Sequence, residues 1–274
     1  MIMEENKTRK LLFGRFSIKR LISSFAFIYA AIAVFIYFFS ERMIFLPQPA
    51  SYEDGDNILK IETEDGVYIS ALYLPKTEAE FTILHSHGNA EDIGDLREFL
   101  EDFNNKGFSV FAYDYQGYGT SEGRPSEKNA YRDIEAAYEY MVGELGIPSN
   151  RIIALGRSVG AGAAVELVRR QKLGGLILES AFTSALRAAM RVRLFPFDKF
   201  NNIDKIKGIN CPILVIHGRV DSIIPIRHGE RLFEAANEPK SHFWVDGAGH
   251  NDLAMVAGDS YWDAIAKFAG TIKE

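Results

Sequence analysis

One serine of the chain stands between two glycines, in the run Gly156-Arg157-Ser158-Val159-Gly160, which fits the pattern G-x-S-x-G. In that pattern a sharp turn between a strand and a helix exposes the serine hydroxyl, and small flanking residues leave room for the turn. The residues before the turn are rich in Ile and Leu, and those after it are rich in Ala and Val. Ser158 is therefore a candidate nucleophile. An ordinary serine that caps a helix in a glycine-rich turn is the alternative.

His250 is the candidate base, because a serine hydroxyl is a poor nucleophile until a base takes its proton. It lies in the glycine-rich run 247–252 after the last predicted strand, where a loop can carry the imidazole back over the edge of a sheet. His217 is the rival base, because it follows a strand and precedes a glycine. However, it comes before the predicted acid, whereas hydrolases with this serine turn have the order serine, acid, histidine.

Asp221 is the candidate acid, because the imidazole needs a carboxylate that holds its tautomer and stabilises its charged form. It stands after the apolar strand that begins near Pro212, and it lies between the serine and the histidine in chain order. Glu179, at the end of the preceding strand, is the alternative acid. The other interpretation of Glu179 is a supporting role beneath the serine turn.

Two backbone N–H groups are candidates to stabilise a developing oxyanion. The first belongs to Val159, directly after the nucleophile, and the second belongs to the loop after the third strand. The run His87-Gly88-Asn89-Ala90 is that loop, and we predict the Asn89 N–H as the donor, with His87 and Gly88 in support. A glycine-containing turn that merely caps the next helix is the alternative, and both roles are compatible.

Metal and cofactor chemistry is not indicated by the remaining residues. His85 and His87 stand two apart at the end of a strand, but no further ligands accompany them, so we assign no metal and no cofactor. The single cysteine, Cys211, excludes an intramolecular disulfide framework and a cysteine-based metal site. We interpret it as a small buried residue.

The hydrophobic pattern predicts the elements that must position these residues. An antiparallel hairpin comes first, and strand and helix patterns then alternate, which predicts a mostly parallel sheet covered by helices on both faces. In such sheets the chemistry gathers at the carboxyl ends of the strands, where the candidate residues stand. The eight predicted strands are 58–63, 67–74, 81–85, 108–113, 151–155, 176–178, 213–216 and 242–245, and the predicted helices include 96–103, 127–145 and 160–170.

The N-terminal region has a pattern of its own. Residues 21–39 form an uncharged apolar run, about long enough to cross a bilayer as one helix. A cleaved signal peptide or a core helix is the alternative, but a signal peptide has a shorter apolar part, and this run has almost no polar face. The basic residues before the run predict a cytoplasmic N-terminus, with the catalytic region on the opposite side, periplasmic or lumenal.

Charge and proline content complete the predicted organisation. Residues 1–20 carry six basic and two acidic side chains, a net charge of +4, so the other residues carry −10 of the total of −6. An acidic body gives no electrostatic reason to bind nucleic acid. We predict a basic N-terminus (1–20), a transmembrane anchor (21–39), a proline-containing connector (40–56) and a catalytic domain (57–274).

At this point the chain resembles the membrane-anchored α/β-hydrolase-domain proteins, of the bud-emergence type. The resemblance covers residues of about 45 to 270 and rests on six blocks in the same order: HSHGNAEDIG, YDYQGYGTSEGRPSE, GRSVGAG, LESAFTSALRAA, CPILVIHGRVDSIIP and GAGHND. It implies hydrolysis of carboxylic esters or thioesters of small or lipid-like acyl substrates, with the roles falling on the residues chosen above. Depalmitoylating relatives carry a cysteine-rich N-terminus, which this chain does not have.

Two expectations follow about the pocket and about competing functions. Only about 31 residues separate Glu179 from Cys211, which leaves room for a minimal lid, with the run 191–200 as a short pocket cover. A peptidase or an acyltransferase would use the same three residues. A catalytically inactive membrane scaffold is the alternative of a different class, and the presence of all three groups argues against it.

Overall fold

The computed structural model describes residues 17–55, 57–190 and 194–272 and divides the chain into two units between Met43 and Ile44. The first unit consists of most of the helix α2 (Ile18–Ile44), which is long and apolar enough to cross a membrane. This helix contains the predicted span 21–39 but begins three residues earlier and ends five residues later. Residues 40–44 are therefore helical and not part of an irregular connector. The helix ends shortly before Pro47, as expected because a proline disfavours helical geometry in the residue before it.

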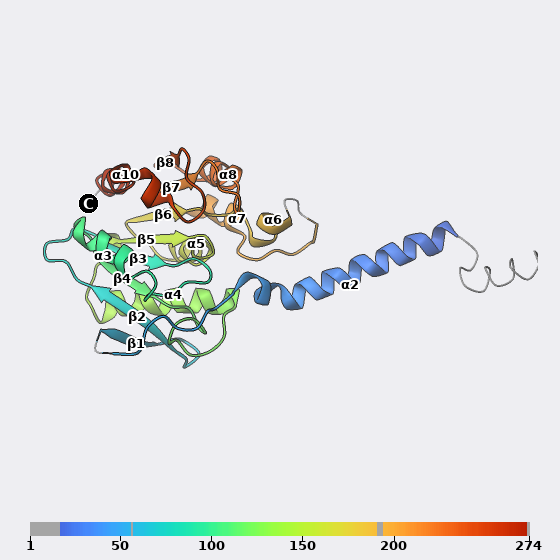
Figure 1. Ribbon diagram of the computed structural model, residues 1–274, viewed down its shortest axis with the longest axis horizontal. Coiled ribbons are helices and arrows are strands. Elements are labelled where there is room, and N and C mark those ends of the chain that lie inside the picture. Colours follow the sequence, from blue (N-terminus) through green and yellow to red (C-terminus); the bar gives the residue numbers. More distant parts are fainter. Residues whose placement is uncertain (1–16, 56, 191–193, 273–274) are drawn as a thin grey trace, which may run out of the picture. The chain divides into compact units, whose positions relative to one another are not determined.

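The second unit is built on one sheet of eight strands, in the order β1-β2-β4-β3-β5-β6-β7-β8 (Figure 1). The pairs β1–β2 and β2–β4 are antiparallel, and all later pairs are parallel, as the sequence predicts. The strands are β1 (Ile58–Glu62), β2 (Tyr68–Leu74), β3 (Thr82–Ser86), β4 (Ser109–Tyr113), β5 (Ile152–Arg157), β6 (Gly175–Glu179), β7 (Ile213–Gly218) and β8 (Lys240–Val245).

The order of the strands brings the candidate residues together. The chain passes from β3 outward to β4 and then returns to form β5 on the other side of β3, so the direction of winding reverses between β3 and β5. Ligands of open α/β sheets bind at such a reversal, outside the carboxyl ends of the strands. Ser86 pairs with Gly156 across β3 and β5, so the loop that follows β3 and the serine turn that follows β5 start side by side.

Helices cover both faces of the sheet. Residues of α4, α5 and α8 belong to one buried hydrophobic cluster, and residues of α3, α9 and α10 belong to a second cluster. The helices are α3 (Arg97–Asn105), α4 (Glu127–Gly143), α5 (Gly160–Arg170), α8 (Arg227–Ala235), α9 (Leu253–Ala257) and α10 (Asp259–Ala269).

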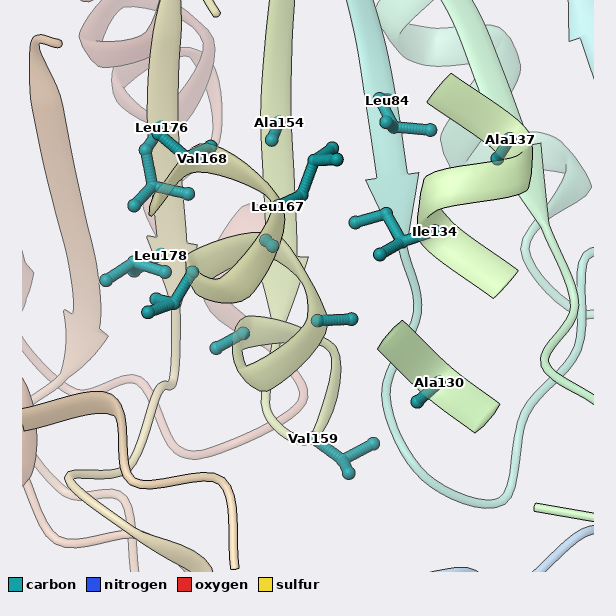
Figure 2. Close-up of a cluster of buried hydrophobic side chains, with 14 of the residues drawn as sticks. Leu84, Ala130, Ile134, Ala137, Ala154, Val159, Leu167, Val168, Leu176 and Leu178 are labelled. Carbon is teal, nitrogen blue, oxygen red and sulfur yellow. The ribbon is translucent and has the colours of Figure 1, made fainter. Parts of the chain in front are cut away.

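Alternation along the central strands explains why both faces are covered. In β5, Ala154 belongs to the first cluster, whereas its neighbours Ile153 and Leu155 belong to the second. Successive side chains of a strand point to opposite faces, so a strand that is apolar at every position needs helices on both sides. Figure 2 shows the first cluster, where Leu167 and Val168 of α5 lie over the sheet.

The segment between β6 and β7 contains two short helices, α6 (Ala185–Met190) and α7 (Asn202–Lys205), which agrees with the predicted minimal lid. Residues 191–193 of the predicted pocket cover lie outside the described residues. The rest of the cover folds back onto the start of α6, because the Asp198 carboxylate accepts hydrogen bonds from the Ser184 hydroxyl, at 2.6 Å, and from the Leu186 N–H, at 3.0 Å.

Candidate active site

Ser158 follows β5 in a sharp turn, with a φ of +51°, a left-handed conformation that is strained for a residue with a side chain. Two glycines of the G-x-S-x-G run are required here by close approaches. A Cβ on Gly160 would lie 2.1 Å from the carbonyl oxygen of Ser86, and a Cβ on Gly156 would lie 2.6 Å from the Cα of Ala161. Larger residues would force the turn open, so these two glycines hold the serine at the edge of the sheet.

Three side chains from three loops form one hydrogen-bonded chain. The Nε2 of His250 lies 3.0 Å from the Oγ of Ser158, and its Nδ1 lies 2.7 Å from the Oδ2 of Asp221. An Nδ1–H that donates to the carboxylate leaves Nε2 unprotonated, so Nε2 is able to accept the serine proton. The loops after β5, β7 and β8 thus bring together the predicted nucleophile, acid and base.

Asp221 is fixed in place by its own loop. Its Oδ1 accepts hydrogen bonds from the backbone N–H groups of Ile223, at 2.9 Å, and Ile224, at 2.7 Å. Burial acts to raise the pKa of Asp221, but hydrogen bonds from His217, His250 and the backbone outweigh burial and hold that pKa below its usual range. The carboxylate therefore stays ionised at neutral pH.

His217, the rival base, lies on the acid and not on the nucleophile. Its Nε2 is 2.7 Å from the carbonyl oxygen of Ile224 and 3.4 Å from the Oδ2 of Asp221, and its side chain is fully buried. The imidazoles of His217 and His250 thus lie near the same oxygen of the Asp221 carboxylate, Oδ2.

Glu179, the alternative acid, has other partners. Its Oε2 accepts a hydrogen bond of 2.6 Å from the hydroxyl of Tyr261, and its Oε1 lies 3.7 Å from the Nε of Arg157. Burial raises the pKa of Glu179. Its backbone carbonyl accepts the N–H of Ser158 at 2.9 Å, so Glu179 supports the serine turn.

The loop His87–Ala90 lies against the serine, as predicted. A Cβ on Gly88 would be 3.9 Å from the Cβ of Ser158, and Ala90 takes a left-handed φ of +60°. Within the part of the chain that the structure describes, the backbone N–H groups of Asn89 and Val159 donate to no protein acceptor.

The buried side chain of His87 contacts the backbone of this loop. Its Nδ1 lies 2.7 Å from the carbonyl oxygen of Gly88, and its Nε2 lies 3.3 Å from the Oδ1 of the fully buried Asp114. Burial acts to lower the pKa of His87, but the nearby Asp114 carboxylate outweighs burial and raises it.

Arg157 is a site residue that the motif analysis did not single out. Its guanidinium lies 3.0 Å from Glu91, which follows the β3 loop, and 3.0 Å from the side-chain oxygen of Asn251, next to His250. Glu91 in turn accepts the N–H of Gly88 at 2.6 Å. The one available signal was the place of an arginine inside the serine motif, next to the nucleophile.

The chain is similar to hydrolases over most of its length. Residues 77–197 match the family described as serine aminopeptidase, S33. Alpha/beta hydrolase domain-containing protein 17B of Homo sapiens is 39% identical over 220 residues, which cover 79% of this chain and 76% of that protein. Protein 17C of Xenopus laevis is 36% identical over 219 residues, which cover 78% and 70%.

A solved structure shares the fold. The esterase Pf2001 of Pyrococcus furiosus superposes with a TM-score of 0.72 at 18% identity, over 84% of this chain and 98% of that one. Taken with the sheet order and the relatives above, these similarities identify the chain as a member of the alpha/beta hydrolase domain-containing protein family.

Proposed function

We propose that the protein is a serine hydrolase that cleaves carboxylic esters or thioesters through an acyl-enzyme, with Ser158 as nucleophile, His250 as base and Asp221 as acid. The observation that carries this proposal is the unbroken chain of hydrogen bonds, 3.0 Å and 2.7 Å long, from the Ser158 hydroxyl through His250 to Asp221. Nucleophile, base and orienting carboxylate within this reach are the requirement for acyl transfer to serine.

In the first half of the reaction, the Oγ of Ser158 forms a bond to the acyl carbon while its proton moves to the Nε2 of His250. The carbonyl oxygen becomes an oxyanion and accepts hydrogen bonds from the N–H groups of Val159 and Asn89. The tetrahedral intermediate then collapses, and the alcohol or thiol leaves with the proton of His250. The product on the enzyme is a serine ester.

In the second half, water takes the place of the leaving group. His250 accepts a proton from the water as its oxygen bonds to the acyl carbon, and the same donors bind the second oxyanion. Collapse returns the proton to Ser158 and releases the carboxylic acid. Asp221 stabilises the imidazolium in both halves without itself taking a proton.

The apolar helix α2 supports a location at a membrane. We propose that α2 spans the bilayer with the basic N-terminus in the cytoplasm, so that the hydrolase acts on lipid-like acyl esters on the periplasmic or lumenal side. Protease added to the outside of spheroplasts should degrade the hydrolase unit. If the hydrolase unit were fully protected and degraded only after lysis, it would lie on the cytoplasmic side, opposite to this proposal.

Labelling with a fluorophosphonate probe tests the hydrolase. We expect the detergent-solubilised full chain to be labelled, Ser158→Ala to lose all labelling and His250→Ala to lose most of it. Ser149→Ala is the matched control, because Ser149 lies at the other end of β5 and bonds to Tyr138 at 2.8 Å. No labelling of the folded wild-type protein would overturn the proposal and favour a membrane scaffold.

A second assay separates the bond types. The family description of serine aminopeptidase favours a peptidase as the second candidate, with the same three residues acting on an amide. Release of acid from acyl esters and thioesters, but not of amines from peptides, would support the leading function. Faster turnover of peptides would replace it. Transfer of the acyl group to added alcohols would identify an acyltransferase.

A further inference from the structure

The last residue of helix α2 and the two residues after it lie at the candidate active site. We call Ile44–Leu46 the strap, and all of it belongs to the hydrolase unit. Its middle residue, Phe45, is only 3% exposed and packs among three rings of the hydrolase. The ring centroids of Tyr115, Tyr118 and Phe200 lie 6.5, 6.4 and 5.8 Å from that of Phe45.

The side-chain amide of Asn89 binds the backbone on both sides of Phe45. Its Nδ2 donates to the carbonyl oxygen of Ile44 at 2.7 Å, and its Oδ1 accepts the N–H of Leu46 at 2.9 Å. The amide thus donates and accepts as a neighbouring strand would, and only one orientation of the amide satisfies both bonds. The strap thereby holds the side chain of the residue whose backbone N–H is the proposed oxyanion donor.

Tyr118 binds both the strap and the side chain of Asn89. Its hydroxyl donates to the Oδ1 of Asn89 at 2.6 Å and accepts the N–H of Leu46 at 3.0 Å. The side chain is 1% exposed, and its ring lies 5.4 Å from that of His87 at the start of the same loop. One buried hydroxyl therefore joins the strap to the loop that carries the proposed oxyanion donor.

The loop needs such support because of its backbone conformation. Ala90 has a φ of +60°, which costs roughly 1 kcal/mol or more for a residue with a side chain. The Oδ1 of Asn89 also accepts the N–H of Ala90 at 3.0 Å, so the same side chain bonds the strained residue and the strap. Without the strap, the loop would be free to turn the Asn89 N–H away from the serine.

We propose that the strap and Tyr118 are positioning elements of the active site, which hold the backbone N–H of Asn89 where it meets the oxyanion. This inference rests on the proposed hydrolase function and on the donor role of Asn89. It assigns catalytic importance to a segment that the sequence places in the connector after the apolar run.

The first test removes the two polar links one at a time in the full chain. Asn89→Ala keeps the backbone N–H but loses the amide, and Tyr118→Phe loses only the hydroxyl. We expect kcat for a soluble acyl ester to fall about 10- to 100-fold in Asn89→Ala and about 3- to 10-fold in Tyr118→Phe, since a donor misplaced by about 1 Å can cost about 100-fold. KM should stay within about twofold, because the lost contact forms in the transition state.

The matched control is Tyr138→Phe. This substitution also removes a hydroxyl that forms one hydrogen bond, of 2.8 Å to Ser149. Tyr138, however, lies on α4 away from the strap. We expect kcat to be unchanged in this variant. Affinity for a boronic acid, which forms a tetrahedral adduct with serine, should fall in Tyr118→Phe by the same factor as kcat/KM and stay constant in Tyr138→Phe.

The second test changes the strap itself. Leu46→Pro removes the N–H that bonds to Asn89 and Tyr118. We expect Leu46→Pro to lower kcat about 10-fold or more, whereas the control Tyr138→Phe keeps the wild-type value. Melting temperatures identify any variant that fails to fold. In that case, the kcat of Tyr118→Phe decides whether the strap has a positioning role.

The outcomes separate this inference from the function on which it rests. If the wild-type chain hydrolyses esters and all strap variants keep its kcat, the positioning role is wrong and the function stands. A rise in KM with kcat unchanged also overturns the inference, because the strap would then only shape the substrate site. If the wild-type chain neither labels nor hydrolyses, the proposed function itself has failed.

Discussion

The two sides of Ser158 are held in different ways. On the base side, His250 joins Ser158 to Asp221 through two hydrogen bonds between side chains, of 3.0 and 2.7 Å. On the oxyanion side, the proposed donor is the backbone N–H of Asn89, a residue whose side chain bonds to Ile44, 45 residues earlier, and to Tyr118, 29 residues later.

This contrast explains which parts of a site a sequence motif can reveal. A side chain that reacts must be a particular amino acid, so the base side is visible in the sequence as a serine, an aspartate and a histidine in order. A backbone N–H is present in every residue except proline, so its function depends on the segments that aim it. A motif therefore predicts which loop carries the donor, whereas the distant segments that hold that loop are seen only in the fold.

The largest expected effect falls on the base side. Asp221→Asn should lower kcat by roughly 10⁴-fold, because the amide favours the wrong tautomer of His250. Glu179→Gln should lower kcat by less than about 10-fold, since Glu179 bonds to Tyr261 and not to the imidazole. Steady-state hydrolysis of an acyl ester measures both.

Equal effects of these two substitutions would remove the contrast between the acid and the supporting carboxylate. Near-normal turnover of Asp221→Asn with a large loss in Glu179→Gln would transfer the acid role to Glu179. A thermal melt of each variant shows whether a loss of turnover reflects unfolding.

The next effect concerns Arg157, which links the two sides. Its guanidinium is 13% exposed and lies near Glu91 and Glu179, so Arg157→Met leaves two carboxylates without this partner. We expect the free energy of unfolding to fall by about 3 kcal/mol in urea titrations. A loss below about 1 kcal/mol would show that the two sides are held independently of this residue.

A smaller effect is expected from His85, which lies on β3 two residues before His87. Burial, with help from the nearby His87 and Arg157, lowers the pKa of His85 from 6.5 to about 3. Because the folded pKa lies below the unfolded one, the unfolded chain binds the extra proton, and stability is lost as the pH falls below about 6.5. At pH 5 this loss is about 2 kcal/mol.

His85→Leu isolates that contribution. Neither ring nitrogen of His85 has a hydrogen-bond partner among the described residues, so leucine leaves no group unpaired. We expect the variant to match or exceed wild-type stability at pH 7 and to lose about 2 kcal/mol less between pH 7 and pH 5. Urea midpoints at the two pH values measure this, and parallel losses in both proteins would show that His85 does not titrate as described.

The smallest effect is expected for a residue that lies far from both sides of Ser158. Arg97 and Glu101 form an ion pair of 2.7 Å on the surface of α3, with side chains 40% and 49% exposed. Arg97→Ala should change the free energy of unfolding by less than about 0.5 kcal/mol and leave kcat unchanged. A loss as large as that of Arg157→Met would mean that burial does not explain the importance of Arg157.

Much of the fold can be predicted from the sequence, because its strands are continuous apolar runs separated by helical patterns. All eight strands lie where the pattern predicts them, within about two residues at each end. The helix α2 is longer than the apolar run, because Ser40, Glu41 and Arg42 are polar but still compatible with a helix. Hydrophobicity marks a membrane span, whereas Pro47 limits the helix.

Within the candidate site, predictability follows the type of contact. Ser158, Asp221 and His250 stand in the loops that follow β5, β7 and β8, so parallel pairing places these loops at one edge. The links from Arg157 to Asn251 and from Asn89 to Ile44 span 94 and 45 residues, and neither has a local pattern. Such contacts depend on how loops of different strands meet in the fold, which motifs and hydrophobic periodicity do not reveal.

The position of Phe45 has a practical consequence for where this enzyme can be cut. A shortened form that starts at Pro47, the proline that limits the helix, would lack Phe45, whose ring packs against those of Tyr118 and Phe200. A form that starts at Ile44 would keep it. The apolar helix could then be exchanged for another segment by design, provided that the three residues after Met43 stay with the hydrolase.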